Sequence, residues 1–154
     1  MTAKTGSKAL IKNPALQSFN LLIGEWQTTG THPAVPGITL HGRSTCQWHE
    51  GGAFLIIHSE INHPDFPDGV AIFGSDDQAK TYYMLYFDER GISRKHDVSL
   101  EGDQLKWWRD DPEFSQRVSM AISGDGNKIT CVGEMSRGGA AWEKDLSLTY
   151  ARLA

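Results

Sequence analysis

Apolar and polar residues change their spacing once along this chain, near residue 24. Before that point the apolar residues recur at the spacing of one helix face; they are Leu16, Phe19, Leu22 and Ile23. Asn13 suits the N-cap of this segment, Pro14 suits its first position, and Gly24 follows its end. The pattern predicts one short helix over residues 14–22.

After residue 24, apolar positions alternate with polar ones, as in strands with one buried face. The predicted strands cover residues 25–31, 37–49, 53–61, 69–74, 81–88, 93–100, 104–109, 114–122, 128–135 and 141–152. Short turns rich in glycine and aspartate separate most of them, which makes sequential strands antiparallel. Because such a sheet removes its edges by closing, we expect an all-β fold, an up-and-down antiparallel β-barrel of about ten strands with one short N-terminal helix.

The predicted inward faces combine apolar residues with single polar groups, such as His96, Gln116 and Lys144. In the strands 53–61 and 81–88 both faces are apolar, so alternation leaves their inward residues open. A barrel of this size tends to hold one small ligand, and apolar walls with a few polar groups are typical of such sites. The candidate cavity residues are Trp48, His58, Tyr82, Tyr86, His96, Gln116, Trp142 and Lys144.

The length of 154 residues fits a single domain, which we assign to residues 13–154, after a mobile tail over residues 1–12. A net charge of −4 without a basic stripe argues against nucleic acid and against a polybasic membrane anchor. No stretch approaches the ~20 apolar residues of a membrane-spanning helix, so we expect no membrane insertion. The N-terminal segment lacks the apolar core of a signal peptide, which predicts a cytoplasmic protein.

The cysteines and histidines show no metal-binding spacing. Cys46 and Cys131 lie far apart, and we expect both to be buried as small apolar side chains. His58, His63 and Asp65 are the nearest group of metal-ligand types, but they span a strand end and a proline-rich loop, so nothing forces them to converge. We expect neither a metal nor a cofactor.

The segment Gly24-Glu25-Trp26, placed after a helix at the start of the first strand, resembles the Gly-x-Trp opening of lipocalins and fatty-acid-binding proteins, the calycin barrels. In those folds the tryptophan packs across the closed end of the barrel, and an arginine near the chain end lies over it. Arg152 matches that arginine here. The resemblance therefore implies that Trp26 and Arg152 form a structural plug.

The chain from about residue 22 onward is also similar to a bacterial lipocalin-like family of unknown function. The segments that carry this resemblance are FDERG at 87–91, DG at 125–126, WEKD at 142–145 and YAR at 150–152. Ten strands further resemble the nitrobindin-like haem barrels, whose haem-ligating histidine lies on a late strand. This chain has no histidine after His96, so haem binding is not carried over.

The first functional hypothesis is a carrier or sensor that binds a small apolar or amphipathic molecule without catalysis. Its motivation is the barrel pattern with polar groups on inward faces. We expect the carboxylate or phenol of such a ligand near His96, Gln116 or Lys144, where an anion would also compensate a buried lysine.

The second hypothesis is an isomerase or hydratase on the same scaffold. His96 or His58 would act as acid and base, assisted by Tyr82 or Tyr86, because one polar pair in an apolar pocket is sufficient for such chemistry. No nucleophile elbow, phosphate loop or dinucleotide motif points to another reaction.

The neighbouring residues Trp107 and Trp108 raise a third hypothesis, which is compatible with either of the others. Adjacent residues of a strand point to opposite faces, so one of the two tryptophans lies outside the barrel. An exposed tryptophan is typical of a surface that another protein covers, so a homodimer stays open as an alternative.

Overall fold

The computed structural model describes residues 12–153. The predicted mobile tail, residues 1–12, lies outside this range except for Lys12, whose backbone N–H donates to the carbonyl oxygen of Gly51 at 3.2 Å. The elements are the 3-10 helix η1 (Pro14–Leu22) and the strands β1 (Gly24–Thr31), β2 (Leu40–His49), β3 (Phe54–Ile61), β4 (Gly69–Asp76), β5 (Thr81–Asp88), β6 (Ser93–Glu101), β7 (Gln104–Arg109), β8 (Phe114–Ile122), β9 (Lys128–Arg137) and β10 (Glu143–Arg152). Within the described range no helix is long and apolar enough to cross a membrane.

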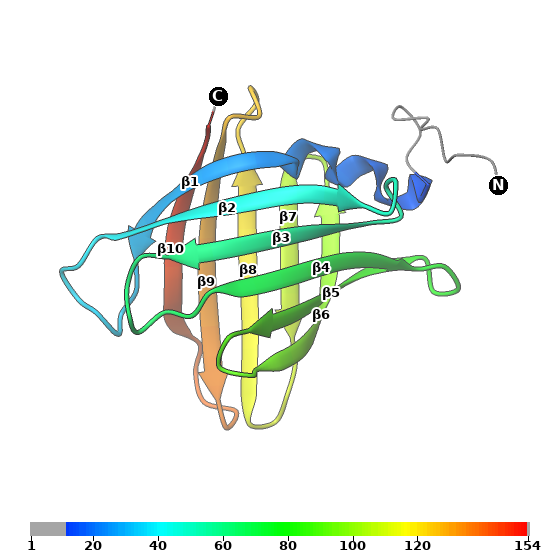
Figure 1. The fold of residues 1–154 in the computed structure, drawn as a ribbon. Coiled ribbons are helices and arrows are strands. Elements are labelled where there is room, and N and C mark those ends of the chain that lie inside the picture. The colour runs from blue at the N-terminus through cyan, green and yellow to red at the C-terminus, as the bar shows by residue number, and fades with distance from the viewer. Residues whose placement is uncertain (1–11, 154) are drawn as a thin grey trace.

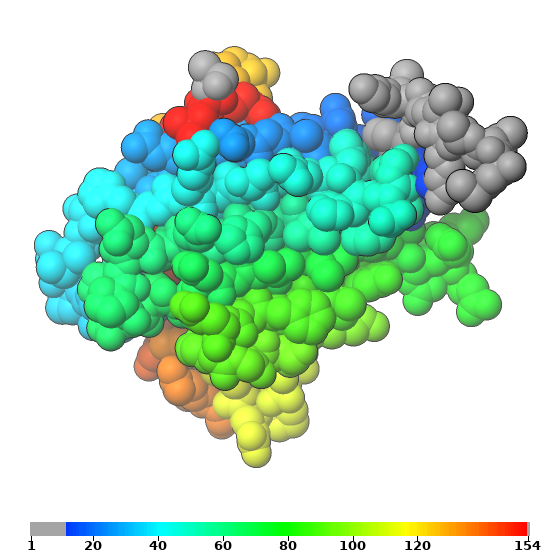
Figure 2. Space-filling view, viewed as in Figure 1, coloured from blue at the N-terminus to red at the C-terminus, as the bar shows by residue number. Residues whose placement is uncertain are grey.

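The ten strands form one closed antiparallel barrel in which every strand pairs with its neighbours in sequence, and β1 also pairs with β10. This confirms the predicted up-and-down barrel. In Figure 1 the strands β2 to β5 in front run steeply across β7 to β9 behind them, so the barrel resembles two curved layers joined at their edges. The residues of β2 to β5 form one continuous outer face (Figure 2).

The helix η1 closes one end of the barrel. The side chain of Asn13 accepts a hydrogen bond from the backbone N–H of Ala15 at 3.2 Å, and Pro14 occupies the first turn, as predicted. The ring of Phe19 lies 5.6 Å from the ring of Phe73 and 4.9 Å from that of Tyr82. The helix therefore covers the strand ends with its apolar face, and the opposite end, which η1 does not cover, is called the open end below.

Strand β2 begins at Leu40, three residues later than predicted. Two turns occupy the preceding segment, in which the backbone N–H of Val35 donates to His32 and that of Ile38 donates to Val35. Gly37, with φ at +77°, is not extended, so the strand begins only after it, which alternation alone did not reveal.

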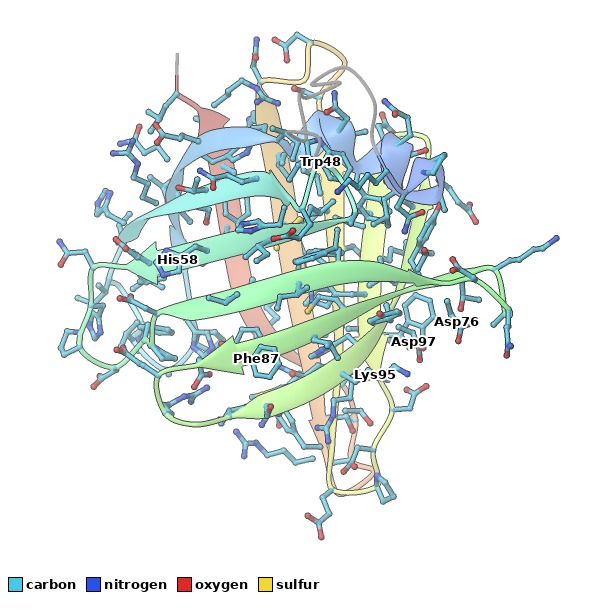
Figure 3. The ribbon with its side chains drawn as sticks, turned by 45° about the vertical axis from the view of Figure 1, so that its right-hand side comes forward. Trp48, His58, Asp76, Phe87, Lys95 and Asp97 are labelled. Atoms are coloured by element: carbon cyan, nitrogen blue, oxygen red, sulfur yellow. The ribbon has the colours of Figure 1, made fainter. Side chains whose placement is uncertain are left out.

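Strand register settles the two ambiguous strands. On β5, Met84 is 2% exposed and faces the interior, so Tyr86, two residues later, faces it too. Tyr86 pairs with Ala71 of β4, which pairs with Ile57 of β3, so both of these residues point inward. His58 is the next residue on β3 and therefore points outward, where its side chain is 49% exposed (Figure 3). The prediction that His58 lines the cavity is wrong, because the adjacent apolar residues of β3 did not reveal the register.

A β-bulge changes the faces at the start of β10. The register with β9 shifts between Lys144 and Ser147, and Lys144 pairs with the outward Glu134. Trp142, which precedes β10, is 37% exposed, and its ring lies under the guanidinium of Arg117. Lys144 and Trp142 thus lie outside the barrel, which corrects their assignment to the cavity: one extra residue reverses the faces of everything before it.

Candidate functional site

The barrel interior has two unlike halves. The half beneath η1 is packed with large apolar side chains, among them Phe19, Leu55, Phe73, Met84, Leu105 and Ile122. These residues are at most 5% exposed. This half is a conventional core, and it leaves the other half, toward the open end, as the place for a ligand.

A plug seals the closed end. The indole N–H of Trp26 donates to the carbonyl oxygen of Leu22 at 2.9 Å, and the guanidinium of Arg152 lies 4.2 Å from the indole centroid. Arg152 also donates to the carbonyl oxygens of Leu21, Ile23 and Gly126. This is the plug geometry that the resemblance to calycin barrels implies.

Toward the open end, one wall of the interior is built from small residues. Most inward positions of β1 to β4 in this half are small, namely Gly30, Gly42, Ser44, Ser59, Gly69 and Ala71, and the larger inward residues are Leu40, Ile57 and Ile61. A Cβ atom on Gly42 would overlap the carbonyl oxygen of Glu60, and one on Gly69 would lie 3.1 Å from the ring of Tyr86. Close strand packing therefore requires these glycines, and they add no side-chain volume to the interior.

The residues beside this wall are less completely covered than those of the core. Ile57, Ala71 and Tyr86 point inward by register, yet all three keep part of their solvent-accessible surface. Residues that point into a filled core, such as Leu55 and Phe73, keep none. The contrast indicates that side chains pack less completely in the half toward the open end than beneath η1.

The opposite wall is polar and cationic. Arg94 and His96 of β6, Arg109 of β7 and Gln116 of β8 occupy neighbouring inward positions. The guanidinium of Arg94 donates to the amide oxygen of Gln116 at 3.3 Å and lies 4.9 Å from the ring centroid of Phe114. Arg109 donates instead to the carbonyl oxygen of Phe114 and forms an ion pair of 3.4 Å with Asp111 of the loop after β7.

The charge of Arg94 is not balanced. No acidic side chain among residues 12–153 forms an ion pair with this guanidinium, and its only side-chain hydrogen bond goes to a neutral amide. Burial lowers the pKa of Arg94, the positive charges of Arg109 and Arg90 lower it further, and Tyr86 and the Asp88 carboxylate act in the opposite direction. A partly buried guanidinium without a carboxylate is costly, and an anion placed beside it would lower that cost.

A third polar group ends β5. Asp88, whose side chain is 0% exposed, accepts a hydrogen bond from the hydroxyl of Tyr86 at 2.9 Å and three from Arg90: two from its guanidinium, at 3.3 and 2.8 Å, and one from its backbone N–H at 2.9 Å. Chiefly through Arg90, these hydrogen bonds lower the pKa of Asp88 to about 2, while burial and the Asp88 carboxylate raise the pKa of Tyr86 to about 12. Asp88 is thereby paired with Arg90, and it affects Arg94 through its charge without forming an ion pair with it.

His96 is the most buried residue of this polar wall. Its side chain is 4% exposed, and its Nδ1 atom has no hydrogen-bond partner among the described residues. Burial lowers the pKa of His96, against the opposing effect of a hydrogen bond with Gln116, so the imidazole is neutral at neutral pH.

Three of the eight predicted cavity residues meet at this site: Tyr86, His96 and Gln116. Trp48 and Tyr82 are inward but are tied to η1, since the indole N–H of Trp48 donates to Asn20 and the hydroxyl of Tyr82 donates to Ala15. His58, Trp142 and Lys144 lie outside the barrel, as described above.

Arg94, Arg109 and Asp88 were not among the predicted site residues. For Arg94 a signal was present, because it alternates with His96 and therefore shares its inward face. Arg109 and Asp88 stand at strand ends, where alternation does not show whether a charged side chain turns inward or into solvent.

The outer surface carries two open grooves. One, of about 390 Å³, lies over β7 to β9 and includes Trp108, Arg117 and Glu134; the other, of about 500 Å³, lies between the β1–β2 loop and the bulge of β10. Trp107 points inward, so of the two adjacent tryptophans only Trp108 is available to an outer surface. Within residues 12–153, no three His, Cys, Asp or Glu side chains group as metal ligands.

Comparison with known proteins supports the fold. No protein-family model matches the chain, and no curated protein matches it. The crystal structure of Rv2717c from M. tuberculosis is similar, with a TM-score of 0.67 and 16% identity over 92% of this chain and 99% of that one. The zebrafish ileal bile acid-binding protein complexed with cholic acid is similar with a TM-score of 0.54 and 15% identity, over 87% of this chain and 100% of that one.

These likenesses and the closed barrel define the class of the protein, which has a calycin-like fold. At 15–16% identity the similarity establishes the fold alone. Function has to be argued from the interior residues of this chain.

Proposed function

We propose that the protein is a non-catalytic carrier or sensor that binds a small amphipathic molecule inside the barrel, with the anionic end of the molecule at Arg94. The observation that carries the proposal is the inward guanidinium of Arg94, which has no acidic partner among the described residues. A ligand carboxylate would supply that partner through charge-assisted hydrogen bonds.

The surroundings of Arg94 fit a carboxylate better than a cation or a neutral group. Arg109 adds a second positive charge nearby, and the amide of Gln116 offers a hydrogen-bond donor. The nearest buried acid, Asp88, is held by Arg90. The local charge is therefore positive until a ligand arrives.

The rest of the ligand would be apolar. Beyond the polar wall, the inward residues lead to Ile57, Ala71 and the side chains beneath η1. Burial of apolar surface contributes roughly 25 cal/mol per Å². The zebrafish protein, crystallised with cholic acid, shows that a barrel of this fold holds an amphipathic acid.

Isothermal titration calorimetry with dodecanoic acid tests the proposal. We expect saturable one-to-one binding, which Arg94→Met weakens by about tenfold to a hundredfold, since a hydrogen bond to a charged group contributes ~1.5–3 kcal/mol. The matched control is Arg43→Met, because Arg43 is an exposed partner of Glu25 on the outer face of β2. Equal binding by all three proteins, or no binding by the wild type, would contradict the proposal.

Acid–base catalysis by His96 is the second candidate, favoured by the unpartnered Nδ1 atom of a neutral imidazole. The groups meant to assist His96 argue against it. Tyr86 is held by Asp88, with its pKa raised to about 12, and Tyr82 is bonded to η1. We therefore expect His96→Gln to alter ligand affinity, and a product formed by the wild type but not by this variant would favour the enzyme.

A further inference from the structure

The outer surface of β3, β4 and β5 is apolar, and we call it the apolar face. Two rows of outward residues cross these strands by register; they are Ile56, Ile72 and Leu85, and in the next row His58, Val70 and Phe87. Phe87 is 40% exposed, and the other apolar members keep part of their accessible surface. These strands therefore carry apolar residues toward the surroundings as well as toward the core.

The outer surface of β8 and β9 has a different composition. There Arg117 pairs with Glu134, and Val132, beside Ser119, is an apolar exception. Antiparallel sheets with one solvated face ordinarily carry polar residues on that face, as β8 and β9 do. A contiguous group of apolar residues on the outside is typical of a surface that another molecule covers.

Polar and charged residues flank the apolar face on β2 and β6. On the β2 side, the row of Ile56 ends at Gln47, and the row before it ends at His49. On the β6 side, the same two rows end at Lys95 and Asp97 (Figure 3). One flank thus offers an imidazole and an amide, and the other offers a carboxylate and an ammonium group at the same two levels.

We propose that the apolar face is the interface of a symmetric homodimer whose two-fold axis runs parallel to β4. About this axis β2 of one copy lies opposite β6 of the other, β3 lies opposite β5, and β4 lies opposite itself. His49 then faces Asp97, and Gln47 faces Lys95. A two-fold interface has to be complementary to itself, and this face meets that condition with apolar residues at the centre and opposite polar groups at the flanks.

Other arrangements fit this face less well. A two-fold axis across the strands would place Asp97 opposite Ser93, without a base for the carboxylate. An anionic membrane surface would be repelled by the acids beyond the two ends of the face, Glu60 on β3 and Asp76 on β4. The same acids limit the contact between two copies to the rows that lie between them, so the interface is small and the dimer weak.

Sedimentation velocity over protein concentrations from about 1 µM to about 500 µM tests the proposal, because we expect a Kd of roughly 10–100 µM. The first variant is Ile72→Asp, which places a charge on the axis at the centre of the face. Its matched control is Val132→Asp, since Val132 is 49% exposed and lies in the groove that also contains Trp108. Urea unfolding curves check that both variants are folded.

A charge exchange tests the orientation of the two copies without altering the apolar residues. His49→Asp places two carboxylates opposite each other and should weaken association by about tenfold. Adding Asp97→Lys to the same chain restores opposite charges, so the double variant should regain the association of the wild type. Arg94→Met should associate like the wild type, because the proposed dimer does not depend on the ligand site.

We expect the sedimentation coefficient of the wild type and of Val132→Asp to rise with concentration, while Ile72→Asp stays monomeric. The proposal is overturned if the wild type is monomeric throughout, if Val132→Asp abolishes association while Ile72→Asp does not, or if the double variant associates no better than His49→Asp. A monomeric wild type that floats with phosphatidylcholine vesicles would show that the apolar face contacts a membrane instead.

Discussion

The two halves of the barrel interior are built on opposite principles. Beneath η1, residues such as Phe19 and Phe73 are fully buried against one another. Toward the open end, mostly small residues on β1 to β4 share the interior with Arg94, His96 and Gln116. The difference shows where stability and function are placed: the filled half stabilises the fold and so allows the other half to keep poorly satisfied polar groups.

The largest expected effect is in the filled half. Phe73→Ala should lower the free energy of unfolding by ~3–5 kcal/mol, because a fully buried ring that contacts Phe19 and Trp107 leaves a cavity. Urea unfolding followed by tryptophan fluorescence measures it. The control is Phe87→Ala, since Phe87 is 40% exposed on the outer face of β5 (Figure 3). Equal losses in the two variants would contradict the assignment of the core.

In the half toward the open end, the expected effect is on ligand-dependent stability. Dodecanoic acid at one hundred times its Kd should stabilise the wild type by about 2.7 kcal/mol, and Arg94→Met should lose most of that gain at the same ligand concentration. Without ligand, we expect Arg94→Met to be as stable as the wild type or more so, because it removes an unbalanced buried charge. Thermal unfolding with and without the acid separates the two effects, and a large loss in the ligand-free variant would show that Arg94 is structural.

Acid should lower the free energy of unfolding in a defined pH range, because it protonates Asp88 at the end of β5. The pKa of Asp88 is about 2 in the folded protein, below its ordinary value of 3.8, so its contribution is present above about pH 4 and is lost as the pH falls toward 2. We expect a contribution of ~1–2 kcal/mol from this fully covered carboxylate. Unfolding curves from pH 6 to pH 2 should show Asp88→Asn less stable near neutrality and equal to the wild type at the acid end.

The exposed turn residue Asp103 provides the comparison for that experiment. Asp103→Asn should follow the wild type over the whole pH range, because the side chain of Asp103 has no hydrogen bond or ion pair within the described part of the chain. If Asp88→Asn shows the same acid dependence as the wild type, the ion pair with Arg90 does not stabilise the strand end.

The smallest expected effect is a gain in stability. Thr28→Val replaces a buried hydroxyl that has no partner with a methyl group of the same shape, which should raise the free energy of unfolding by ~1 kcal/mol. The control is Thr45→Val on the outer face of β2, where Thr45 pairs with His58. This change should alter the free energy of unfolding by less than about 0.5 kcal/mol. A loss of stability in Thr28→Val would mean that the hydroxyl has a partner, such as a bound water, in solution.

The sequence predicts those features of the structure that a local pattern of residues determines. Alternation and turn residues sufficed for η1, the ten strands and their antiparallel order, because each is determined within a few residues. His58 was misplaced since both faces of β3 are apolar, and Lys144 and Trp142 were misplaced since a bulge in β10 reverses their face. The site depends on which inward residues become neighbours across strands, and that depends on register, which alternation alone does not give.

The charge balance at Arg94 is a clear example. The sequence shows that Arg94 and His96 share a face, but it does not show that Asp88 is held by Arg90 and that Arg109 pairs with Asp111. Those pairings leave Arg94 without an acid, and they arise from the turns after β5 and β7.

The most direct test of the central claim is a crystal structure of the protein with dodecanoic acid bound. The account predicts the acid inside the barrel, its carboxylate within hydrogen-bond distance of the Arg94 guanidinium and its chain directed past Ile57 toward the core beneath η1. A carboxylate found in either groove of the outer surface, or an interior filled by repacked side chains with the acid excluded, would contradict the account.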